Sequence, residues 1–279
     1  MSDCALYIVA TPIGNLGDLS QRAIEILKQV DVVAAEDTRH SQKLMSHFGV
    51  DTPLVPCHEH NERQQAGRLL SRLENGESVA LVSDAGTPLI SDPGYYLVRQ
   101  AREAGYKVVP VPGACALIAA LSVSGLATDR FYFEGFLPAK SSARVKRLEQ
   151  LAEMPNTWAV YESTHRILDS LADCRKVLGA DRHMVLAREI TKTFETVIAG
   201  SVATVEQSLQ EDSDQRRGEF VLLVEGFQEE SDKTVDDQTR KLLERLLREM
   251  PVKKAATVVA DVTDYRKNEL YELALSMKG

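Results

Sequence analysis

Short, largely apolar runs alternate with amphipathic segments along the first 125 residues of the chain. Four such runs lie at residues 6–10, 30–34, 79–82 and 108–111. Strands that are buried on both faces of a parallel sheet have this pattern, because helices cover both faces. Helical periodicity is predicted over residues 21–29, 41–48, 63–73, 96–104 and 114–124. This strand–helix rhythm predicts an α/β domain with a mostly parallel sheet.

A second α/β unit is predicted after residue 125. Its expected strands are 131–135, 157–161, 184–187, 196–199 and 219–225, and its expected helices are 142–152, 165–178 and 201–209. Residues 226–237 are polar and acidic, which indicates a linker, and three short helices are expected beyond it at 238–250, 252–262 and 267–277. The sequence therefore predicts two α/β domains, at 1–123 and 124–228, and a small helical domain at 235–279 with a helix-turn-helix outline.

The longest uncharged stretch covers residues 108–128 and is long enough to cross a bilayer. Pro110, Pro112 and Gly113 interrupt it near its start, and such residues break a helix. The segment is therefore interpreted as a buried strand, a Pro-Gly turn and a helix of small residues, and not as a membrane span.

Composition places the chain among soluble globular proteins, with 44% hydrophobic and 27% charged residues. The formal net charge of −8 argues against a positively charged coat for indiscriminate nucleic-acid binding, although a local basic face is compatible with it. The charge is uneven, because residues 233–279 carry +2 and the remainder carries −10. On charge alone, this tail fits a nucleic-acid-binding module about as well as a packing or dimerisation appendage.

The four cysteines, Cys4, Cys57, Cys115 and Cys174, include no Cys-x-x-Cys pair. Their spacing predicts reduced thiols and no zinc site. No positively charged region precedes an apolar run at the N-terminus, so a signal peptide is not expected and the predicted location is the cytoplasm.

Gly, Pro and small polar residues follow the predicted strands of the first domain. In a parallel α/β sheet, ligands bind beyond these carboxyl ends, and small residues let a ligand approach the backbone closely. The first strand is not followed by Gly-x-Gly-x-x-Gly, and neither a P-loop nor a Gly-x-Ser-x-Gly motif is present. These absences disfavour a dinucleotide-binding fold, a P-loop enzyme and a hydrolase.

Two groups near these strand ends have open roles on the residues alone. Asp84 could accept hydrogen bonds from a ligand, or it could cap the next segment as a turn residue. His58 and His60 resemble a metal-binding pair, but no third ligand is nearby, so solvated histidines are favoured and no metal site is predicted. The residues predict an enzyme with one cleft and a helical appendage, and they do not name its ligand.

Eight segments taken together resemble the tetrapyrrole methylase superfamily. Within it they resemble the family that 2′-O-methylates a cytidine in the decoding region of 16S, or small-subunit, ribosomal RNA. The resembling segments occur in order at residues 7–16, 35–40, 83–94, 111–113, 133–138, 161–166, 187–192 and 218–226. One such motif would be weak, whereas eight in order are specific. The resemblance implies an S-adenosylmethionine-dependent methyltransferase with its cofactor in a cleft between two α/β domains, and an added C-terminal helical domain.

The resemblance also implies which residues bind the cofactor. Ser83, Asp84 and Thr87 would hold its methionine and ribose portions, although Ser-Asp-Ala-Gly-Thr-Pro stands where many tetrapyrrole enzymes have Gly-Gly-Asp-Pro, which leaves the register open. The other implied cofactor residues are Pro12 in the first loop, Cys115 and Ala116 after the Pro-Gly turn, Tyr161, Glu162 and Ile190 on the adenine side, and Gly218 and Glu219 nearby.

The implied reaction is a displacement at a methyl carbon, so the protein has mainly to align the 2′-oxygen with that methyl group. A base could help by removing the hydroxyl proton. Asp37 is the first hypothesis for this base and Glu36 the second, and His58, His60 and Glu162 are further candidates. An equally good alternative for Asp37 is a structural role, in which it bonds Arg39 or caps the following helix.

Ribosomal RNA, naked or in an assembled small subunit, is the expected partner, and the superfamily implies a homodimer. RNA would contact local basic residues, for which the candidates are Arg39, His40, Lys140, Arg144, Lys146, Arg147, Lys192, Arg216 and Arg217, with Lys253, Lys254, Arg266 and Lys267 in the tail. Two alternatives remain on the sequence: a methylase of the same fold that acts on a tetrapyrrole, and a non-enzymatic regulator that senses a ligand and binds nucleic acid.

Overall fold

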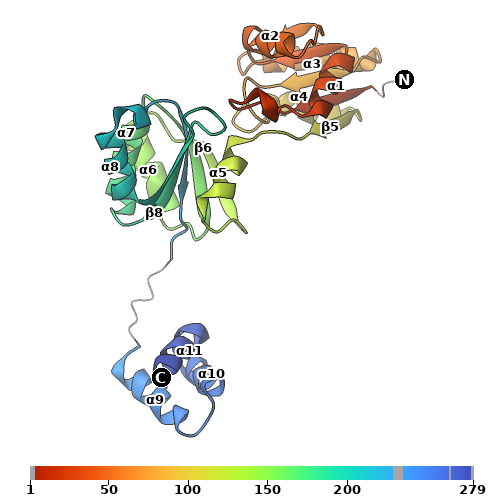
Figure 1. Cartoon of the computed structure of the whole chain (residues 1–279). Helices are drawn as coiled ribbons and strands as arrows, with labels where there is room; N and C mark the ends of the chain where they lie inside the picture. The colour runs from red at the N-terminus through yellow and green to blue at the C-terminus, as the bar shows by residue number, and fades with distance from the viewer. Residues whose placement is uncertain (1–3, 229–234, 264, 278–279) are drawn as a thin grey trace. The chain divides into compact units, whose positions relative to one another are not determined.

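A computed structural model describes residues 4–228, 235–263 and 265–277 of the chain. The chain divides into two compact units, Met1–Phe227 and Gln228–Gly279, which are called the body and the tail below (Figure 1). Residues 229–234 of the predicted linker lie outside the described residues.

The first sheet of the body is parallel throughout and has the strand order β3-β2-β4-β1-β5. Its strands are β1 (Ala5–Val9), β2 (Val32–Ala35), β3 (Leu54–Pro56), β4 (Val79–Val82) and β5 (Lys107–Val111). Its helices are η1 (Leu16–Asp18), α1 (Gln21–Gln29), α2 (Thr38–His47), α3 (Glu62–Glu74) and α4 (Tyr95–Glu103).

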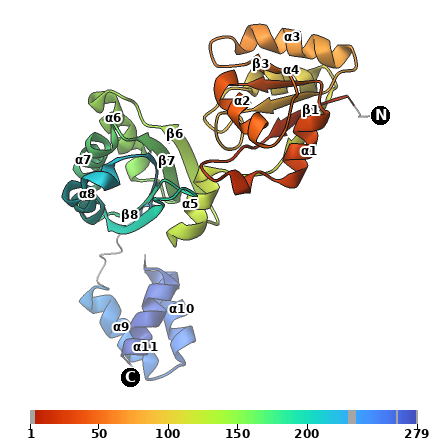
Figure 2. The same cartoon turned by 45° about the horizontal axis from the view of Figure 1, so that its top comes forward.

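Both faces of this sheet are covered by helices (Figure 2). Val33 and Ala35 of β2 pack in the core beneath α1 and α2, whereas Val32 and Ala34 pack in the core beneath α3 and α4. Every position of such a strand is buried, which explains why the strands appear in the sequence as apolar runs.

The sequence prediction missed β3, which is three residues long, lies at the sheet edge and contains Pro56. A strand of this length has no periodicity to detect, and proline is tolerated in a sheet mainly at an edge. The predicted second strand began two residues early, because Val30 ends α1 and donates its backbone N–H to Ile26.

The second sheet is mixed, with the order β6-β7-β10-β8-β9, and only β6 and β7 pair in parallel. Its strands are β6 (Phe131–Phe136), β7 (Thr157–Ser163), β8 (His183–Arg188), β9 (Thr196–Ser201) and β10 (Glu219–Val224). One face packs on α6 (Ser141–Ala152), α7 (Ile167–Leu178) and α8 (Val202–Glu211), and η2 (Ser213–Arg216) follows α8.

The opposite face of the second sheet packs on α5 (Ala116–Ser124). Leu117 and Leu121 of this helix contact a core that contains Ala159, Val221 and Leu223 of the sheet. The sequence prediction instead placed residues up to 123 in the first domain, because it followed chain continuity past β5. No helix among the described residues is long and apolar enough to cross a membrane.

The tail consists of α9 (Asp237–Leu247), α10 (Val252–Val262) and α11 (Lys267–Ser276). Leu243, Ala255, Val259 and Leu270 form a hydrophobic core shared by the three helices. Asp236 caps α9 by accepting the backbone N–H groups of residues 238 and 239, and it also accepts the Tyr265 hydroxyl at 2.9 Å. The tail therefore has its own core and its own cap.

Candidate functional site

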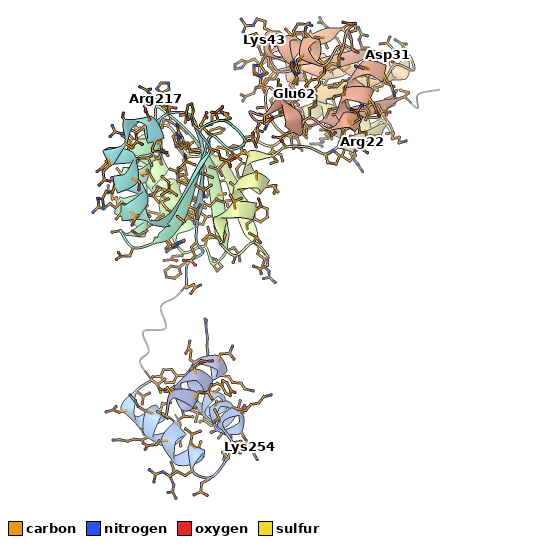
Figure 3. The ribbon with its side chains drawn as sticks, in the orientation of Figure 1. Arg22, Asp31, Lys43, Glu62, Arg217 and Lys254 are labelled. Carbon is orange, nitrogen blue, oxygen red and sulfur yellow. The ribbon has the colours of Figure 1, made fainter. Side chains whose placement is uncertain are left out.

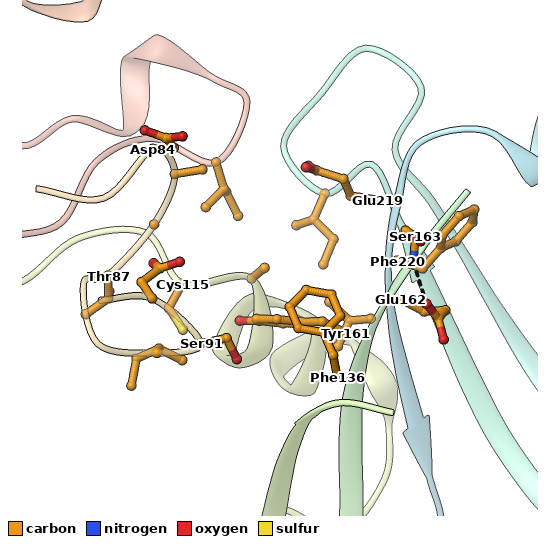
Figure 4. A pocket seen from close by; sticks show the side chains of 18 of the residues that line it. Asp84, Thr87, Ser91, Cys115, Phe136, Tyr161, Glu162, Ser163, Glu219 and Phe220 are labelled. Atoms are coloured by element: carbon orange, nitrogen blue, oxygen red, sulfur yellow. Dashed lines mark hydrogen bonds between the residues drawn. The ribbon is translucent and has the colours of Figure 1, made fainter. Parts of the chain in front are cut away.

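A pocket of about 380 Å³ in volume is lined by loops and strand ends of both sheets. This volume is typical of pockets that bind small molecules or cofactors. Figure 4 shows Asp84 and Thr87, from the loop after β4, across the pocket from Tyr161 on β7 and Glu219 on β10. The site therefore combines carboxyl-end loops of the parallel sheet with residues of the mixed sheet, as the strand-end argument predicted.

Most of the predicted cofactor residues line this one pocket. They are Asp84, Thr87, Cys115, Ala116, Tyr161, Glu162, Ile190 and Glu219. Pro12, Ser83 and Gly218 do not line it. The structure thus brings residues 84 to 219 of the predicted set together, whereas their individual roles stay predictions.

Two of the residues outside the pocket wall hold its loops in place. The buried Ser83 accepts the Thr11 hydroxyl through its carbonyl oxygen at 3.2 Å, and Thr11 also pairs with Gly86 through both backbone groups. Gly218 has a φ of +106°, and a side chain there would lie 2.5 Å from the Glu189 carboxylate. These residues position the lining and do not contact the cavity.

Hydrogen bonds connect the loops of the first sheet that contribute to the pocket. The Thr87 hydroxyl donates to the carbonyl of Ala114 at 3.0 Å, which joins the loop after β4 to the Pro-Gly turn after β5. Asp84 Oδ1 accepts the backbone N–H of Asp37 at 2.9 Å, which joins the loops after β4 and β2. A ligand would therefore meet a preformed wall.

Tyr161 forms the wall of the pocket on the side of the second sheet. Its ring packs edge-on against Phe133 and Phe136, and its hydroxyl accepts the backbone N–H of Leu117 at 3.2 Å. Burial raises the pKa of the Tyr161 hydroxyl, so the phenol stays neutral at physiological pH. The residue offers a flat apolar surface and no charge.

Lys192 spans the outer side of the pocket. Its Nζ donates to Glu189 Oε1 at 2.7 Å and to Glu219 Oε2 at 2.8 Å. The loop after β1 passes close to it, since a Cβ added at Gly14 would lie 2.2 Å from Lys192 Cγ. Lys192 was predicted to contact RNA, and the structure places it instead at the cavity, with its charge shared by two carboxylates.

Glu162 does not suit the catalytic role that was predicted for it. Its side chain is fully buried, with 0% exposed, on the face of the sheet that packs on α7. The carboxylate accepts Arg166 Nε at 2.8 Å, the Ser170 hydroxyl at 2.6 Å and the backbone N–H of Ser163 at 2.9 Å. Figure 4 shows it on the far side of β7 from Tyr161, because successive side chains alternate across a strand. The catalytic prediction for Glu162 is therefore wrong in this structure.

Asp37 also has a structural environment. It is the N-cap of α2, where Oδ1 accepts the Arg39 backbone N–H at 2.8 Å, and Oδ2 pairs with the Arg39 guanidinium at 2.7 Å. The bonds to Arg39 hold the pKa of Asp37 well below its usual range, which makes the carboxylate a weak proton acceptor. Asp37 does not line the pocket, whereas its neighbour Glu36 does, and burial raises the pKa of Glu36.

We expect Asp37→Ala to leave methyl transfer within about threefold of the wild type, because no general-base contribution is lost. The same substitution should lower the free energy of unfolding, because α2 loses its N-cap. Single-turnover transfer from labelled S-adenosylmethionine and urea unfolding measure the two effects. A hundredfold loss of rate with unchanged stability would restore Asp37 as the base.

The two histidines that resembled a metal pair lie close to each other, with ring centroids 6.1 Å apart, but neither lines the pocket. Within the described ranges, no group of three His, Cys, Asp or Glu side chains could hold a metal ion.

Two residues predicted to contact RNA use their guanidinium groups within the body. The buried Arg144 pairs with Asp173 at 2.7 Å and donates to the carbonyl oxygens of Pro138 and Ala139. The prediction for Arg144 is therefore wrong, because a buried side chain whose donors are taken up inside the protein cannot contact RNA. Arg216 is half-buried and donates to the carbonyl oxygens of Leu209 and Gln210, where it caps the end of α8, and its contact with RNA stays a prediction.

The other predicted RNA residues remain at the surface to different degrees. Arg147 is partly covered and pairs with Glu134, while Arg39 and Arg217 are exposed but paired with Asp37 and Asp214. The exposed residues for which the structure gives no ion pair are His40, Lys140, Lys146, Lys253, Lys254, Arg266 and Lys267. Figure 3 shows Lys254 on the outer surface of the tail.

Sequence reasoning missed several lining residues, and Ser91, Asp92 and Phe136 are among them. All three lie inside segments that had been singled out, at 83–94 and 133–138. The signal was therefore present, but the prediction stopped at the first residues after the strands.

Comparison with known proteins identifies the family of the chain. A family model described as tetrapyrrole (corrin/porphyrin) methylases matches residues 5–206, and a model of the RsmI C-terminal HTH domain matches residues 233–278. Among solved structures, cobalt precorrin-4 methyltransferase has a TM-score of 0.57 at 18% identity, and the two alignments cover 80% of this chain and 95% of that one. Diphthine synthase has a TM-score of 0.59 at 15% identity, and the alignment covers 80% of this chain and 90% of that one. These structures share the fold of the body.

Curated relatives are much closer in sequence. Ribosomal RNA small subunit methyltransferase I of Pseudomonas aeruginosa is 56% identical over 100% of this chain and 99% of its own length. The protein of the same name from Pasteurella multocida is 56% identical over 97% of this chain and 96% of its own length. With its body and tail both matched, the chain belongs to the tetrapyrrole methylase family and, within it, to the ribosomal RNA small subunit methyltransferase I family.

Proposed function

We propose that the chain transfers a methyl group from S-adenosylmethionine to the ribose 2′-hydroxyl of a cytidine in the decoding region of small-subunit ribosomal RNA. The observation that carries the proposal is the similarity of both units to one set of relatives, at 56% identity over the whole chain. A tetrapyrrole methylase would need only the body, and the additional match of the tail favours RNA over the tetrapyrrole alternative.

The pocket residues suit this cofactor, which carries positive sulfonium and ammonium groups. Glu36 and Asp84 give the first-sheet side of the pocket a negative lining, and Tyr161 and Phe136 give the other side aromatic surface for an adenine ring. When bound, S-adenosylmethionine supplies a methyl carbon that is already activated for displacement. The protein then contributes mainly orientation, through the wall that Thr87, Asp84 and Tyr161 form.

RNA would reach the pocket mouth from outside, and basic residues outside the pocket lining would hold it. Lys253, Lys254, Arg266 and Lys267 of the tail are exposed, and we propose that they contact phosphates. The acidic body limits nonspecific RNA binding, so such contacts have to be local. The proposed substrate implies that the enzyme acts in the cytoplasm, where ribosomal subunits are.

Loss of the modification from cells that lack the chain tests the function directly. The 2′-O-methylation of small-subunit RNA is mapped with and without the gene, and the purified chain is incubated with labelled S-adenosylmethionine and small subunits, naked RNA or uroporphyrinogen. We expect label in RNA at one cytidine. Label in uroporphyrinogen alone, or an unchanged modification map, would contradict the proposal.

We also propose that the chain forms a homodimer through α5. One side of this helix packs on the second sheet, yet Ile118 and Val123 on its other side are 53% and 57% exposed. Helices that are apolar on all sides are normally buried on all sides, and a second copy would cover this face.

Ile118→Asp should therefore convert a dimer to a monomer in light scattering at micromolar concentration, because a charge would be buried at the contact. Lys146→Asp, on the exposed side of α6, is the matched control and should leave the dimer intact. A wild-type chain that is monomeric over the same range would rule out this interface.

A further inference from the structure

Six carboxylates line the pocket, and each of them accepts a hydrogen bond from another group of the protein. Glu162 is buried beneath the sheet, Glu189 and Glu219 share Lys192, and Asp84 accepts the backbone N–H of Asp37. Glu36 and Asp92 differ from these four because burial raises their pKa values and no cationic side chain among the described residues is hydrogen-bonded to them. Glu36 accepts a hydrogen bond from the backbone of Asp84. Asp92 has Ser83 as its hydrogen-bonding partner.

The loop that carries Asp92 is held in an unusual backbone conformation. Leu89 and Ser91 have positive φ values of 73° and 67°, which non-glycine residues rarely adopt. Strained positions of this kind concentrate at functional sites, where the surrounding structure imposes them. The two strained residues flank Ile90, and Ser91 directly precedes Asp92, so the fold constrains the backbone that carries the Asp92 side chain.

A buried carboxylate anchors the far end of the same loop. Glu62 accepts the backbone N–H of Gly94 at 3.0 Å and that of Tyr96 at 2.7 Å, at the start of α4. Gly94 has a φ of +128°, and a Cβ there would lie 2.6 Å from Leu81. The loop from 89 to 94 therefore has little freedom, and Asp92 is presented to the pocket by a rigid support.

Asp92 faces acidic and neutral groups. Burial, together with the nearby charges of Glu36 and Asp84, raises its pKa to about 6, against the opposing effect of the Ser83 hydrogen bond. Tyr161, across the pocket, is close enough for Asp92 to influence its pKa. No cation contributes to the pKa of Asp92. A carboxylate in this environment gains a proton more readily than an ordinary aspartate.

We propose that Asp92 accepts the proton of the substrate hydroxyl during methyl transfer, an inference that rests on the proposed function. The 2′-oxygen forms a bond to the methyl carbon while the carbon–sulfur bond breaks and leaves its electron pair on sulfur. The hydroxyl proton passes to the Asp92 carboxylate, so the positive charge of the sulfonium is neutralised and a carboxylic acid is formed. General bases work best with a pKa near the operating pH.

Asp92→Asn tests the assignment in the full chain. At saturating S-adenosylmethionine and small subunits from cells that lack the chain, the single-turnover rate should fall by about 10²–10⁴-fold. The wild-type rate should rise with pH through about 6, since the carboxylate must be ionised to accept a proton, and this limb should be absent from the variant. Cofactor affinity, measured by calorimetry, should stay within about twofold. Asp51→Asn, at an exposed position of the same domain, is the control and should change none of these values.

A second readout needs neither cofactor nor substrate. The pKa of Asp92 is raised from 3.8 in the unfolded chain to about 6, so the stability from its protonation is present below pH 3.8 and lost as pH rises through about 6. At pH 7.5 the buried charge destabilises the fold, so Asp92→Asn should raise the melting temperature by about 2–6 °C. At pH 5 about half of this difference should disappear, and below pH 3.8 nearly all of it.

Three results would overturn the assignment. The first is a variant rate within threefold of the wild type. The second is a cofactor affinity reduced more than tenfold with a normal rate at saturation, which would make Asp92 a cofactor contact. The third is loss of the acid limb in Glu36→Gln but not in Asp92→Asn. If the wild-type chain transfers no methyl group to subunits, the proposed function fails together with the Asp92 assignment. If the wild-type chain transfers the methyl group and Asp92→Asn does so at the same rate, the Asp92 assignment fails and the proposed function stands.

Discussion

Replacement of Glu162 by alanine is expected to lower the free energy of unfolding by about 3 kcal/mol, the low end for breaking a buried ion pair. The carboxylate is fully buried and satisfies Arg166, Ser170 and the backbone of Ser163. Without it, the Arg166 guanidinium, which is 24% exposed, would remain as a charge that water reaches only in part. Urea unfolding of the full chain, followed by the single tryptophan, Trp158, measures the loss.

Conservative variants separate this structural role from a catalytic one. Glu162→Gln keeps an acceptor for Ser170 and should lose less stability than Glu162→Ala. Ser170→Ala removes one hydrogen bond and should cost about 1 kcal/mol. For all three, the methyl-transfer rate per folded molecule should remain near that of the wild type. If Glu162→Gln were as stable as the wild type but a hundredfold slower, Glu162 would have to act on the reaction itself.

Removal of residues 228–279 is expected to leave cofactor affinity within about twofold and to weaken binding of small subunits at least about tenfold. The body would retain the whole pocket, because every lining residue lies before Phe227. The truncated chain should fold, since the tail has a separate core. Calorimetry with S-adenosylmethionine and filter binding of labelled subunits measure the two affinities, and equal subunit binding by both chains would contradict the prediction.

Charge reversals within the full chain show whether the cations of the tail account for this loss. In the described part of the tail, the ion pairs are Arg245–Glu249 and Arg248–Glu244, and Lys254 belongs to neither. Lys254→Glu should therefore weaken subunit binding and flatten its salt dependence. Arg245→Glu is the matched control, because this side chain already has a carboxylate beside it. If both variants weaken binding equally, general charge and not a specific contact would be responsible.

Fold and pocket position could be predicted to different depths from the sequence. The strands of the first sheet are buried on both faces and could be predicted from their apolar runs. Helix α1 has the predicted bounds, because a serine cap and a strong periodicity define it. The loops that form the pocket were predicted because parallel strands present their carboxyl ends at one edge. The predicted bounds of α5 were within two residues of those observed. The sheet on which α5 packs could not be predicted, because it depends on which sheet offers a complementary apolar face.

Individual side chains were harder to predict than the loops that carry them. The sequence by itself determined that residues 161 and 162 of β7 point to opposite faces, since a strand has a period of two. Only the tertiary structure decided which face is the cavity, because α7 brings Arg166 and Ser170 to Glu162 and leaves Tyr161 at the pocket. In the same way, Arg144 is a basic residue in the sequence and a buried partner of Asp173 in the fold. Local pattern sets the period and the class of each side chain, whereas contacts between residues far apart in the chain decide whether its charge is used inside the protein or left for a ligand.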